Sequence, residues 1–579
     1  METKKYVTDV LIVGGGTAGT MAAIKAKETN PELEVLILDK ADIRRSGAIS
    51  MGMDGLNNAV IPGYATPEEY TLEITEANDG IVDQIAVYRQ AKECYEVVKE
   101  LDSWGVDFEK DENGRFVVHR VHRKGRYVLP MPKASNLKQI LARQVRKAKC
   151  KVVNRVMVTR LLTHDNTVVG AMGLDVINGD FIIVHAKAVI LTAGAAGRMS
   201  LTDSGYLYGT YENPTNSGEG FAMAYHAGAE LTGIECYQIN PTMKDYNGPA
   251  CAYVAGPYGG YTANAEGKRV TGCDYWSGEL IMNMWKLANQ GESPLYLKMD
   301  HLDEKVIQKI ESILHYNERP SRGTFHKGRG NDYRTDMVEL HFSEIGLCSG
   351  HSAAGVLVNH EAETSMKGLY AAGDMACVPH QYLLGALTFG KIAGINATRF
   401  ASSQSEIEPD ISQIEAERER IYKPLQNPDG VPHHQVEYKI RNIVTQYLMP
   451  PKTTTKMDIA LKKIEHFRKV DLNLLGARDP HELGRALEVH SIVDCAEMMA
   501  RSSLFRKESR WGFYHYYLDY PERDDQNWLK RVIVKKGADG KMKLYTRDLP
   551  PQILDDSGFT QAYYDLFKKE ETGHEQSVS

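Results

Sequence analysis

Apolar segments alternate with glycine-rich turns over the first 40 positions. Residues 9–13 form a short apolar strand that ends in glycines, residues 18–26 carry apolar side chains at helical spacing, and residues 34–39 form a second apolar strand. A strand without polar interruptions is typical of a central parallel strand that is buried on both faces. The pattern therefore predicts a β-α-β unit at the N-terminus.

The later pattern predicts that this first unit continues much further along the chain. A helical stretch covers residues 66–104, where a proline follows Thr66 as it does at many helix starts. Strand patterns follow at residues 151–162, 168–176, 181–184 and 188–192. Asn178 and Gly179 form a hairpin turn between two of these strands. The strand at 188–192 again ends in glycine, as the first strand does.

A change of composition separates three parts of the chain. Residues from about 240 to 345 are richer in Gly, Tyr and Asn, and the strand at residues 368–374 then ends in glycine once more. This pattern is typical of an insertion within a domain. The fold class is therefore predicted to be α/β, with a dinucleotide-binding (Rossmann-like) domain. We expect a discontinuous first domain, an inserted domain and a C-terminal helical domain, at residues 1–240 with 346–401, 241–345 and 402–579.

Composition excludes several classes of protein. The 579 residues contain 69 Lys and Arg against 76 Asp and Glu, so the net charge is −7 and no nucleic-acid partner is expected. No apolar run approaches the roughly 20 residues that span a bilayer, so no integral membrane segment is expected. The N-terminus lacks the apolar region of a signal peptide, which predicts a cytoplasmic protein. The eight cysteines are scattered without a CxxC pair, so an iron-sulfur cluster held by this chain alone is not expected.

The first glycine-rich turn has the G-x-G-x-x-G spacing of a dinucleotide-binding site. Gly14 allows a tight turn, Gly16 lets the backbone approach a pyrophosphate, and Gly19 allows close packing of helix and strand. Asp39 stands twenty positions after Gly19, where it can accept hydrogen bonds from a ribose. The motif predicts a dinucleotide ligand but does not separate FAD from NAD.

Other segments resemble a family of FAD-dependent oxidoreductases. The loop at residues 45–57 is similar to the flavin-contacting loop of the fumarate reductase, succinate dehydrogenase and adenylylsulfate reductase flavoproteins. The segments at residues 477–483, 504–511 and 519–522 resemble the end of the adenylylsulfate reductase alpha subunit. The resemblance implies an FAD-binding domain, a capping domain as the insertion, and an iron-sulfur partner of the ferredoxin type with [4Fe-4S] clusters.

Departures from the family patterns bear on the cofactor and the substrate. Gly47 stands where covalently flavinylated fumarate reductases carry a histidine, so the resemblance implies non-covalent FAD. Asn240 replaces the histidine of a His-Pro-Thr motif, and Leu383 and Leu384 replace a segment that carries a substrate-binding arginine in fumarate reductases. These changes predict that a dicarboxylate is a poor substrate. No catalytic arginine can be assigned from the pattern.

The resemblance assigns roles to individual residues. His380 matches a histidine of both related groups and is expected to donate a proton or to bind an anionic substrate, and Asn57 matches an active-site asparagine. For Asn57, and for His351 in a loop that resembles a flavin-edge loop, a structural role is an equal alternative. Further cofactor contacts are expected at Lys40, Ser46, Gly47, Ala193, Gly194 and Asp374. No metal site is expected.

Two roles stay open for the basic run at residues 115–126. It is either a solvated face or a surface that attracts an anionic substrate or an acidic electron-transfer partner.

The main hypothesis for the function is an FAD-dependent oxidoreductase like adenylylsulfate reductase alpha, acting on a small anionic substrate. The alternatives are a fumarate reductase-like enzyme acting on another small anion, and a non-catalytic subunit that binds FAD and relays electrons.

Overall fold

The computed structural model describes residues 1–51, 55–120, 127–133, 136–201, 212–246, 255–270, 278–318, 320–350 and 352–566. Its largest sheet has seven strands in the order β6-β2-β1-β9-β8-β7, with β16 also paired to β9. The apolar N-terminal segment forms β1 (Thr3–Val13), which lies parallel to β2 (Val35–Asp39) on one side and β9 (Phe181–Leu191) on the other. The predicted β-α-β unit is therefore present at the N-terminus.

The strand β9 corrects one detail of the sequence prediction. The two strands expected at residues 181–184 and 188–192 are a single strand, and the polar residues between them do not end it. Lys187 forms an ion pair of 2.7 Å with Asp9, at the start of the buried half of β1. The predicted turn at Asn178 and Gly179 joins β8 (Thr167–Asp175) to β9 in antiparallel pairing.

The chain returns to this sheet after the insertion. β16 (Leu369–Ala371) pairs with β9 in parallel, alongside residues 189–191 of that strand. After the insertion the chain thus returns to the first sheet. The sheet is completed by β6 (Lys151–Asn154) and β7 (Val156–His164), which the sequence pattern had joined into one strand.

Helices cover the sheet with close contacts at glycine. α1 (Thr17–Thr29) packs against α10 (Tyr382–Ser403), where a Cβ atom at Gly390 would lie 2.4 Å from the Ala18 carbonyl oxygen. Gly394, one turn later, approaches Ala22 in the same way. The predicted helical stretch at 66–104 is two helices, α2 (Pro67–Ala77) and α3 (Gln84–Ser103), and a third helix is α4 (Leu137–Lys147).

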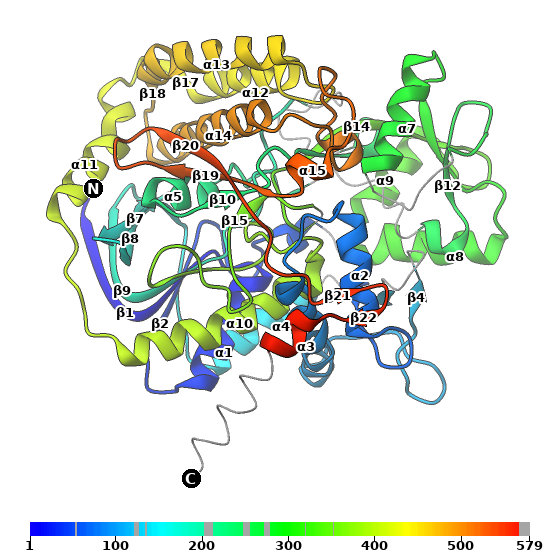
Figure 1. Cartoon of the computed structure of the whole chain (residues 1–579), viewed down its shortest axis with the longest axis horizontal. Coiled ribbons are helices and arrows are strands. Elements are labelled where there is room, and N and C mark those ends of the chain that lie inside the picture. The colour runs from blue at the N-terminus through cyan, green and yellow to red at the C-terminus, as the bar shows by residue number, and fades with distance from the viewer. Residues whose placement is uncertain are drawn as a thin grey trace.

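The insertion forms a separate lobe, drawn in green in Figure 1. Its sheet has the order β11-β14-β13-β12. The long strands β11 (Gln238–Met243) and β14 (Val338–Gly346) connect the lobe to the first domain, and β12 (Tyr261–Ala263) and β13 (Leu295–Lys298) lie beyond them. The helices of the lobe are α7 (Gly278–Asn289), α8 (Glu304–Glu311) and α9 (Pro320–Arg329).

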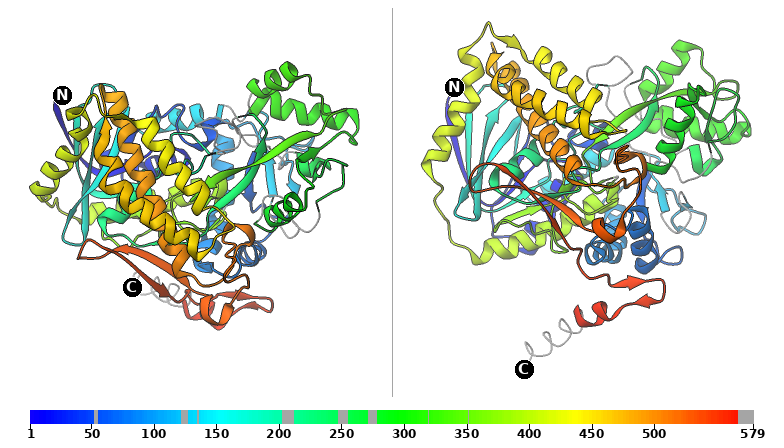
Figure 2. Two further views of the ribbon diagram at one scale, coloured as in Figure 1. Left: turned by 90° about the horizontal axis from the view of Figure 1, so that it is seen from above. Right: turned by 45° about the horizontal axis from the view of Figure 1, so that its top comes forward.

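The C-terminal part is a layer of helices followed by strands. The helices are α11 (Ile411–Tyr422), α12 (His433–Tyr447), α13 (Thr454–Lys469) and α14 (Pro480–Phe505). Figure 2 shows the yellow and orange helices lying together against the rest of the molecule in both views. Beyond them β19 (Arg531–Lys536) and β20 (Met542–Arg547) join a sheet with β10 (Leu231–Thr232) and β15 (Gly355–Val356). This part is therefore not wholly helical, because its last strands pair with the first domain.

Short elements complete the architecture. β3 (Gly55–Ala59), β4 (His119–Arg120) and β5 (Tyr127–Pro130) form a small sheet, and α5 (Glu219–Ala227) follows the segment after β9. The described part of the chain closes with β21 (Leu554–Asp555), β22 (Gly558–Phe559) and a short helical segment up to residue 566. Gln84 anchors this end, because its side-chain oxygen accepts a hydrogen bond of 2.9 Å from the Leu554 amide. No helix within the described residues combines the length and the apolar character needed to cross a membrane.

Candidate active site

Glycines shape the turn between β1 and α1. Gly14 has a φ of 105°, and a Cβ atom there would lie 2.5 Å from the carbonyl oxygen of Thr192. A Cβ atom at Gly19 would lie 1.9 Å from the carbonyl oxygen of Gly14. These contacts agree with the tight turn and the close helix-strand packing that the motif predicts.

The N-terminus of α1 is available to a ligand. Gly16 is the N-cap residue, and no side chain in the described structure caps the helix. The carboxylate of Asp39 accepts hydrogen bonds of 2.7 Å from the Gly15 and Ala41 amides, so it fixes the turn from the end of β2. Uncapped amides at a helix N-terminus favour an anionic group such as a pyrophosphate.

A cavity opens above this turn. Nine of the ten predicted cofactor residues line it: Gly14, Gly16, Asp39, Lys40, Ser46, Gly47, Ala193, Gly194 and Asp374. Gly19 instead lies in the contact between α1 and the sheet, in agreement with the packing role given to it. The segments that supply this wall lie far apart in the sequence and meet because the ends of β1, β2, β9 and β16 share one edge of the sheet.

The sequence motif did not identify a lysine that supports the glycine turn. Lys138, in α4, donates a hydrogen bond to the carbonyl oxygen of Gly15, and its side chain is buried. Burial lowers the pKa of Lys138 to about 8, although the charges of Asp39 and Asp42 act in the opposite direction. Lys138 therefore places an amine behind the turn. No local pattern in α4 marks it, because its role depends on the packing of α4 beside α1.

The loop after β2 is fixed against the same turn. The hydroxyl of Ser46 donates a hydrogen bond of 3.0 Å to the carbonyl oxygen of Gly15. Gly47 has a φ of 84°, and a Cβ atom there would lie 3.0 Å from the Cα atom of Gly16. Asn213 donates a hydrogen bond of 3.1 Å to the Gly47 carbonyl oxygen. The backbone at position 47 thus favours glycine in both conformation and space.

Asp374, at another part of the wall, lies near a second buried carboxyl group, that of Glu212. Burial raises the pKa of Asp374 to about 6. Burial and the charge of Asp374 raise the pKa of Glu212 to about 8. Near neutral pH one of the two carboxyls is therefore able to hold a proton and act as a hydrogen-bond donor.

His380 and Asn57 are brought to the same region. The side chain of Asn58, adjacent to Asn57, donates a hydrogen bond of 2.9 Å to the carbonyl oxygen of His380. Asn58, His380 and Tyr382 have positive φ values of 60°, 56° and 48°. Such backbone conformations are uncommon for residues other than glycine and concentrate at functional sites. Asp374 and Ala386, which come before and after His380 in the chain, both line the cavity, whereas His380 does not.

Further buried amides lie on β11. The hydroxyl of Tyr514 donates a hydrogen bond of 3.2 Å to Oδ1 of Asn240 and accepts one of 3.5 Å from Gln238. Nδ2 of Asn240, Oε1 of Gln238 and Oδ1 of Asn57 are buried without hydrogen-bond partners among the described residues. Buried polar atoms of this kind are often satisfied by a ligand or by water. His351, the third predicted catalytic residue, lies outside the described residues, as do residues 121–126 of the basic run.

The sequence motif, the cavity and the discontinuous sheet define a dinucleotide-binding oxidoreductase fold. A family model described as an FAD binding domain matches residues 9–383, and one described as the fumarate reductase flavoprotein C-terminus matches residues 437–558. The first of these covers more than half of the chain. The chain belongs to this FAD-binding family and is an FAD-dependent oxidoreductase of the fumarate reductase and adenylylsulfate reductase type.

Individual relatives match over nearly the whole chain. One subunit of the fumarate reductase (CoM/CoB) of Methanothermobacter marburgensis is 26% identical, covering 93% of this chain and 98% of that protein. A fumarate reductase flavoprotein subunit of Mycobacterium tuberculosis is 25% identical, covering 93% of this chain and 96% of that protein. The structure of adenylylsulfate reductase from Archaeoglobus fulgidus has a TM-score of 0.88 and 25% identity, covering 95% of this chain and 97% of that one. The first two relatives are named as subunits of reductases.

Proposed function

We propose that this chain is the flavoprotein subunit of a reductase for a small anionic substrate, with adenylylsulfate as the first candidate. The substrate would bind beside His380, between the first domain and the capping lobe. Bound FAD would supply two-electron redox chemistry, which side chains do not provide. The chain's own residues would bind the cofactor in the cavity, orient the substrate and supply a proton.

The position of His380 is the observation that carries this proposal. Its side chain is 8% exposed, and its backbone is tied to β3 by the hydrogen bond from Asn58. An imidazole titrates near neutral pH, so it can give a proton to a leaving group or stabilise an anion. In adenylylsulfate reduction, two electrons reduce sulfur while the bond from sulfur to the AMP oxygen breaks, and that oxygen takes up negative charge. His380 is suited to balance this charge.

The apolar segment after His380 and the buried amides of β3 and β11 favour neutral hydrogen bonding over ion pairing with two carboxylates. The first turn of α10 contributes Leu383 and Leu384, which are both buried. Asn57 and Asn240 offer an amide acceptor and an amide donor that have no partner among the described residues. Amides of this kind fit the oxygens and the N–H groups of a nucleotide-linked oxyanion, whereas a dicarboxylate is usually bound by guanidinium groups.

The substrate proposal is tested by rates with the FAD-loaded protein and an artificial electron mediator. Adenylylsulfate, sulfite with AMP, fumarate and succinate are compared under the same conditions. We expect turnover with adenylylsulfate, or with sulfite and AMP, and slow turnover with fumarate. Fast fumarate reduction would favour the fumarate reductase-like alternative, which the relative from Methanothermobacter marburgensis supports by its name. No turnover with any of the four would favour an electron-relay role.

The FAD is proposed to be bound non-covalently. In the family resemblance Gly47 occupies the position of the flavinylated histidine, and a glycine has no side chain that could bond to the flavin. Its positive φ of 84° also favours glycine at this position. Acid precipitation of the purified protein should release the yellow colour into the supernatant. Flavin that stays with the denatured pellet would contradict the proposal.

A ferredoxin-like subunit with [4Fe-4S] clusters is proposed as the electron partner. Within the described residues no group of three or more His, Cys, Asp or Glu side chains could hold a metal ion. The described cysteines are free thiols, most of them buried. The test is to mix the FAD-loaded chain with a reduced two-cluster ferredoxin and to follow bleaching of the flavin absorption. Absence of bleaching with ferredoxins of this type would count against such a partner.

A further inference from the structure

One wall of the FAD cavity is backed by a helix from the C-terminal part of the chain. Thr215, Asn216 and Glu219 line the cavity, and Gly218 between them is the left-handed N-cap of α5. This wall segment, residues 215–219, lies opposite the end of β2, where Asp39 and Lys40 also line the cavity. In dinucleotide-binding folds the acidic residue at this strand end lies beside the adenosine ribose. The wall segment therefore bounds the adenosine end.

Two residues of α14 touch this wall from outside the cavity. The carboxylate of Glu488 is 2.9 Å from Nζ of Lys40. Seven positions later on the same helix face, the thiol of Cys495 donates a hydrogen bond of 3.6 Å to the Gly218 carbonyl oxygen. A Cβ atom at Gly218 would lie 2.5 Å from the Cys495 sulfur, so α14 is packed closely against the wall.

Lys40 connects the two sides of the adenosine end. Its ammonium group donates hydrogen bonds to the Thr215 carbonyl oxygen and to the Glu219 carboxylate. The lysine thus spans from the end of β2 to the start of α5. Burial alone would lower the pKa of Lys40, but the charges of Glu219 and Glu488 raise it above its ordinary value. The ammonium group therefore stays charged, and Glu488 is one of its two carboxylate partners.

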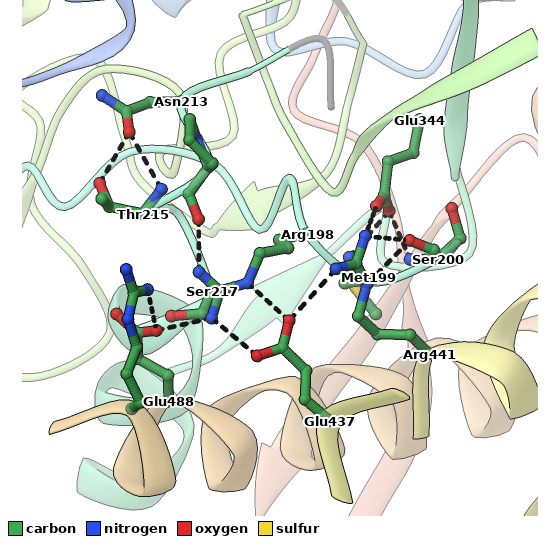
Figure 3. Close-up of polar contacts among 12 residues, drawn as sticks. Arg198, Met199, Ser200, Asn213, Thr215, Ser217, Glu344, Glu437, Arg441 and Glu488 are labelled. Atoms are coloured by element: carbon green, nitrogen blue, oxygen red, sulfur yellow. Dashed lines mark hydrogen bonds and ion pairs between the residues drawn. The ribbon is translucent and has the colours of Figure 1, made fainter. Parts of the chain in front are cut away.

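Glu488 belongs to a buried network of ion pairs, drawn in Figure 3. Arg198 lies between Glu488, at 2.6 Å, and Glu437 of α12, at 3.0 Å. Glu437 also pairs with Arg441 at 3.2 Å, and Arg441 lies 3.7 Å from Glu344 on β14. Glu488 and Glu437 thus share Arg198 and are both buried, but only Glu488 contacts a residue that lines the cavity.

We propose that Glu488 is a positioning residue for FAD, which holds Lys40 and the wall segment in place around the adenosine end. The C-terminal part of the chain is then a component of the cofactor site as well as a structural layer. This inference rests on FAD occupying the described cavity. It does not depend on the identity of the substrate or of the electron partner.

The experiment compares Glu488→Gln with Glu437→Gln in the full chain. Each change removes one carboxylate from Arg198 and leaves the other in place. Glu488→Gln also removes a partner from Lys40 and Arg485, whereas Glu437→Gln removes one from Arg441. The protein is stripped of FAD and titrated with FAD, while quenching of flavin fluorescence gives the Kd. We expect the Kd of Glu488→Gln to rise about tenfold or more and that of Glu437→Gln to stay within about twofold, with similar losses in Tm.

Titration with ADP separates positioning from general destabilisation. ADP carries the adenosine half of FAD without the flavin, so Glu488→Gln should weaken ADP competition by the same factor as FAD binding. Lys40→Met should also weaken FAD binding, and adding Glu488→Gln to it should have little further effect, because Glu488 acts through Lys40. If Glu488→Gln folds poorly, Lys40→Met in the otherwise intact chain supplies the test, and unchanged FAD affinity in Lys40→Met would overturn the positioning role.

The outcomes distinguish the inference from the proposed function. Unchanged FAD affinity in Glu488→Gln, or an equal loss in Glu437→Gln, would overturn the positioning role. Additive effects of Lys40→Met and Glu488→Gln would also overturn it. Failure of the wild-type protein to bind FAD would instead reject the cofactor assignment itself.

Discussion

The cofactor cavity and the region around His380 are constructed in different ways. The cavity wall is largely backbone, supplied by glycine turns at the ends of parallel strands and by the uncapped start of α1. The region around His380 depends on side-chain amides and hydroxyls from β3, α2 and α3, which meet only in the folded chain. Backbone groups can bind a dinucleotide shared by many enzymes, whereas side chains set which substrate is used.

Two buried amines of the molecule are also held in different ways. Lys40 beside the cavity has two carboxylate partners. Lys452 lies behind the start of β11, where its Nζ contacts the Glu235 carbonyl oxygen, the Ser503 hydroxyl and Nδ1 of His515 at 2.7, 3.0 and 3.2 Å. None of these three partners is a carboxylate. Burial lowers the pKa of Lys452 to about 7, although the charges of Cys236 and Glu235 oppose this shift.

The largest effect is expected from Gly19→Ala on the cofactor side. The added methyl group would meet the Gly14 carbonyl oxygen at 1.9 Å, so α1 must move away from the sheet and the turn must open. We expect FAD affinity to fall by at least about 100-fold, on the order of 3 kcal/mol, with a clear loss in Tm. Gly328→Ala is the control, because its Cβ atom would have nothing within 4 Å and Gly328 does not line the cavity. Equal FAD affinity in both variants would contradict the packing argument.

The contrast between backbone and side chains also explains what could be predicted from sequence. The β-α-β unit, the glycine turn and the return of the chain at β16 follow from local patterns that do not depend on distant contacts. Lys138, Glu488 and Asn58 could not be identified in this way. Lys138 and Glu488 act across helix contacts between distant segments, and no spacing within α4 or α14 distinguishes them from other polar residues.

A bulge accounts for the asparagine that sequence reasoning missed. The pairing of β3 with β5 shifts register between Asn57 and Ala59, and Asn58 has a positive φ at this point. The extra residue turns the Asn58 side chain toward His380, while Asn57, its neighbour, is the residue that the family resemblance indicates. A single-residue bulge leaves no pattern in the sequence that could be read in advance.

On the substrate side, His380→Ala should lower kcat by about 100-fold, the usual scale for loss of a positioned proton donor. FAD affinity should stay unchanged, since His380 is not among the residues that line the cavity. The measurement compares rates at equal FAD occupancy in the mediator assay. An unchanged kcat would remove His380 from the mechanism, and a loss of FAD would show that the two regions are not separate.

The two lysines should give opposite pH dependences of stability. The folded-state pKa of Lys452 lies below that of the unfolded chain, so between about pH 7 and 10 the unfolded chain binds more protons and stability rises with pH. Lys452→Met should remove a rise on the order of 3 kcal/mol across this window. The raised pKa of Lys40 means that its contribution is complete below about pH 10 and is lost only above it.

The comparison of lysines is measured by urea unfolding at several pH values. The difference in free energy of unfolding between wild type and Lys452→Met should change with pH from 7 to 9, whereas that for Lys40→Met should stay constant. A flat difference for Lys452→Met would mean that its three hydrogen bonds keep the amine charged. For Lys40→Met, a difference in free energy of unfolding that changes between pH 7 and 9 would contradict the carboxylate pairing described above.

The smallest effect is expected from Asn58→Gly, which tests how His380 is positioned. Asn58 has a φ of 60°, a conformation that glycine adopts without strain, so the substitution removes the amide while keeping the backbone. The His380 carbonyl oxygen then loses its donor at 2.9 Å and keeps the more distant Tyr70 hydroxyl at 3.4 Å. We expect kcat to fall about fivefold, on the order of 1 kcal/mol, with FAD affinity unchanged.

The control for Asn58→Gly uses His380 itself. If Asn58 acts only by positioning His380, the substitution should have no further effect on kcat in a His380→Ala background. The pH at which kcat is half-maximal should also shift in Asn58→Gly, because a displaced imidazole meets different neighbours. Asn58→Ala should lose additional stability without a further loss in kcat, since alanine is strained at this φ. A kcat loss in Asn58→Gly that persists in the absence of the His380 side chain would mean that Asn58 contacts the substrate directly.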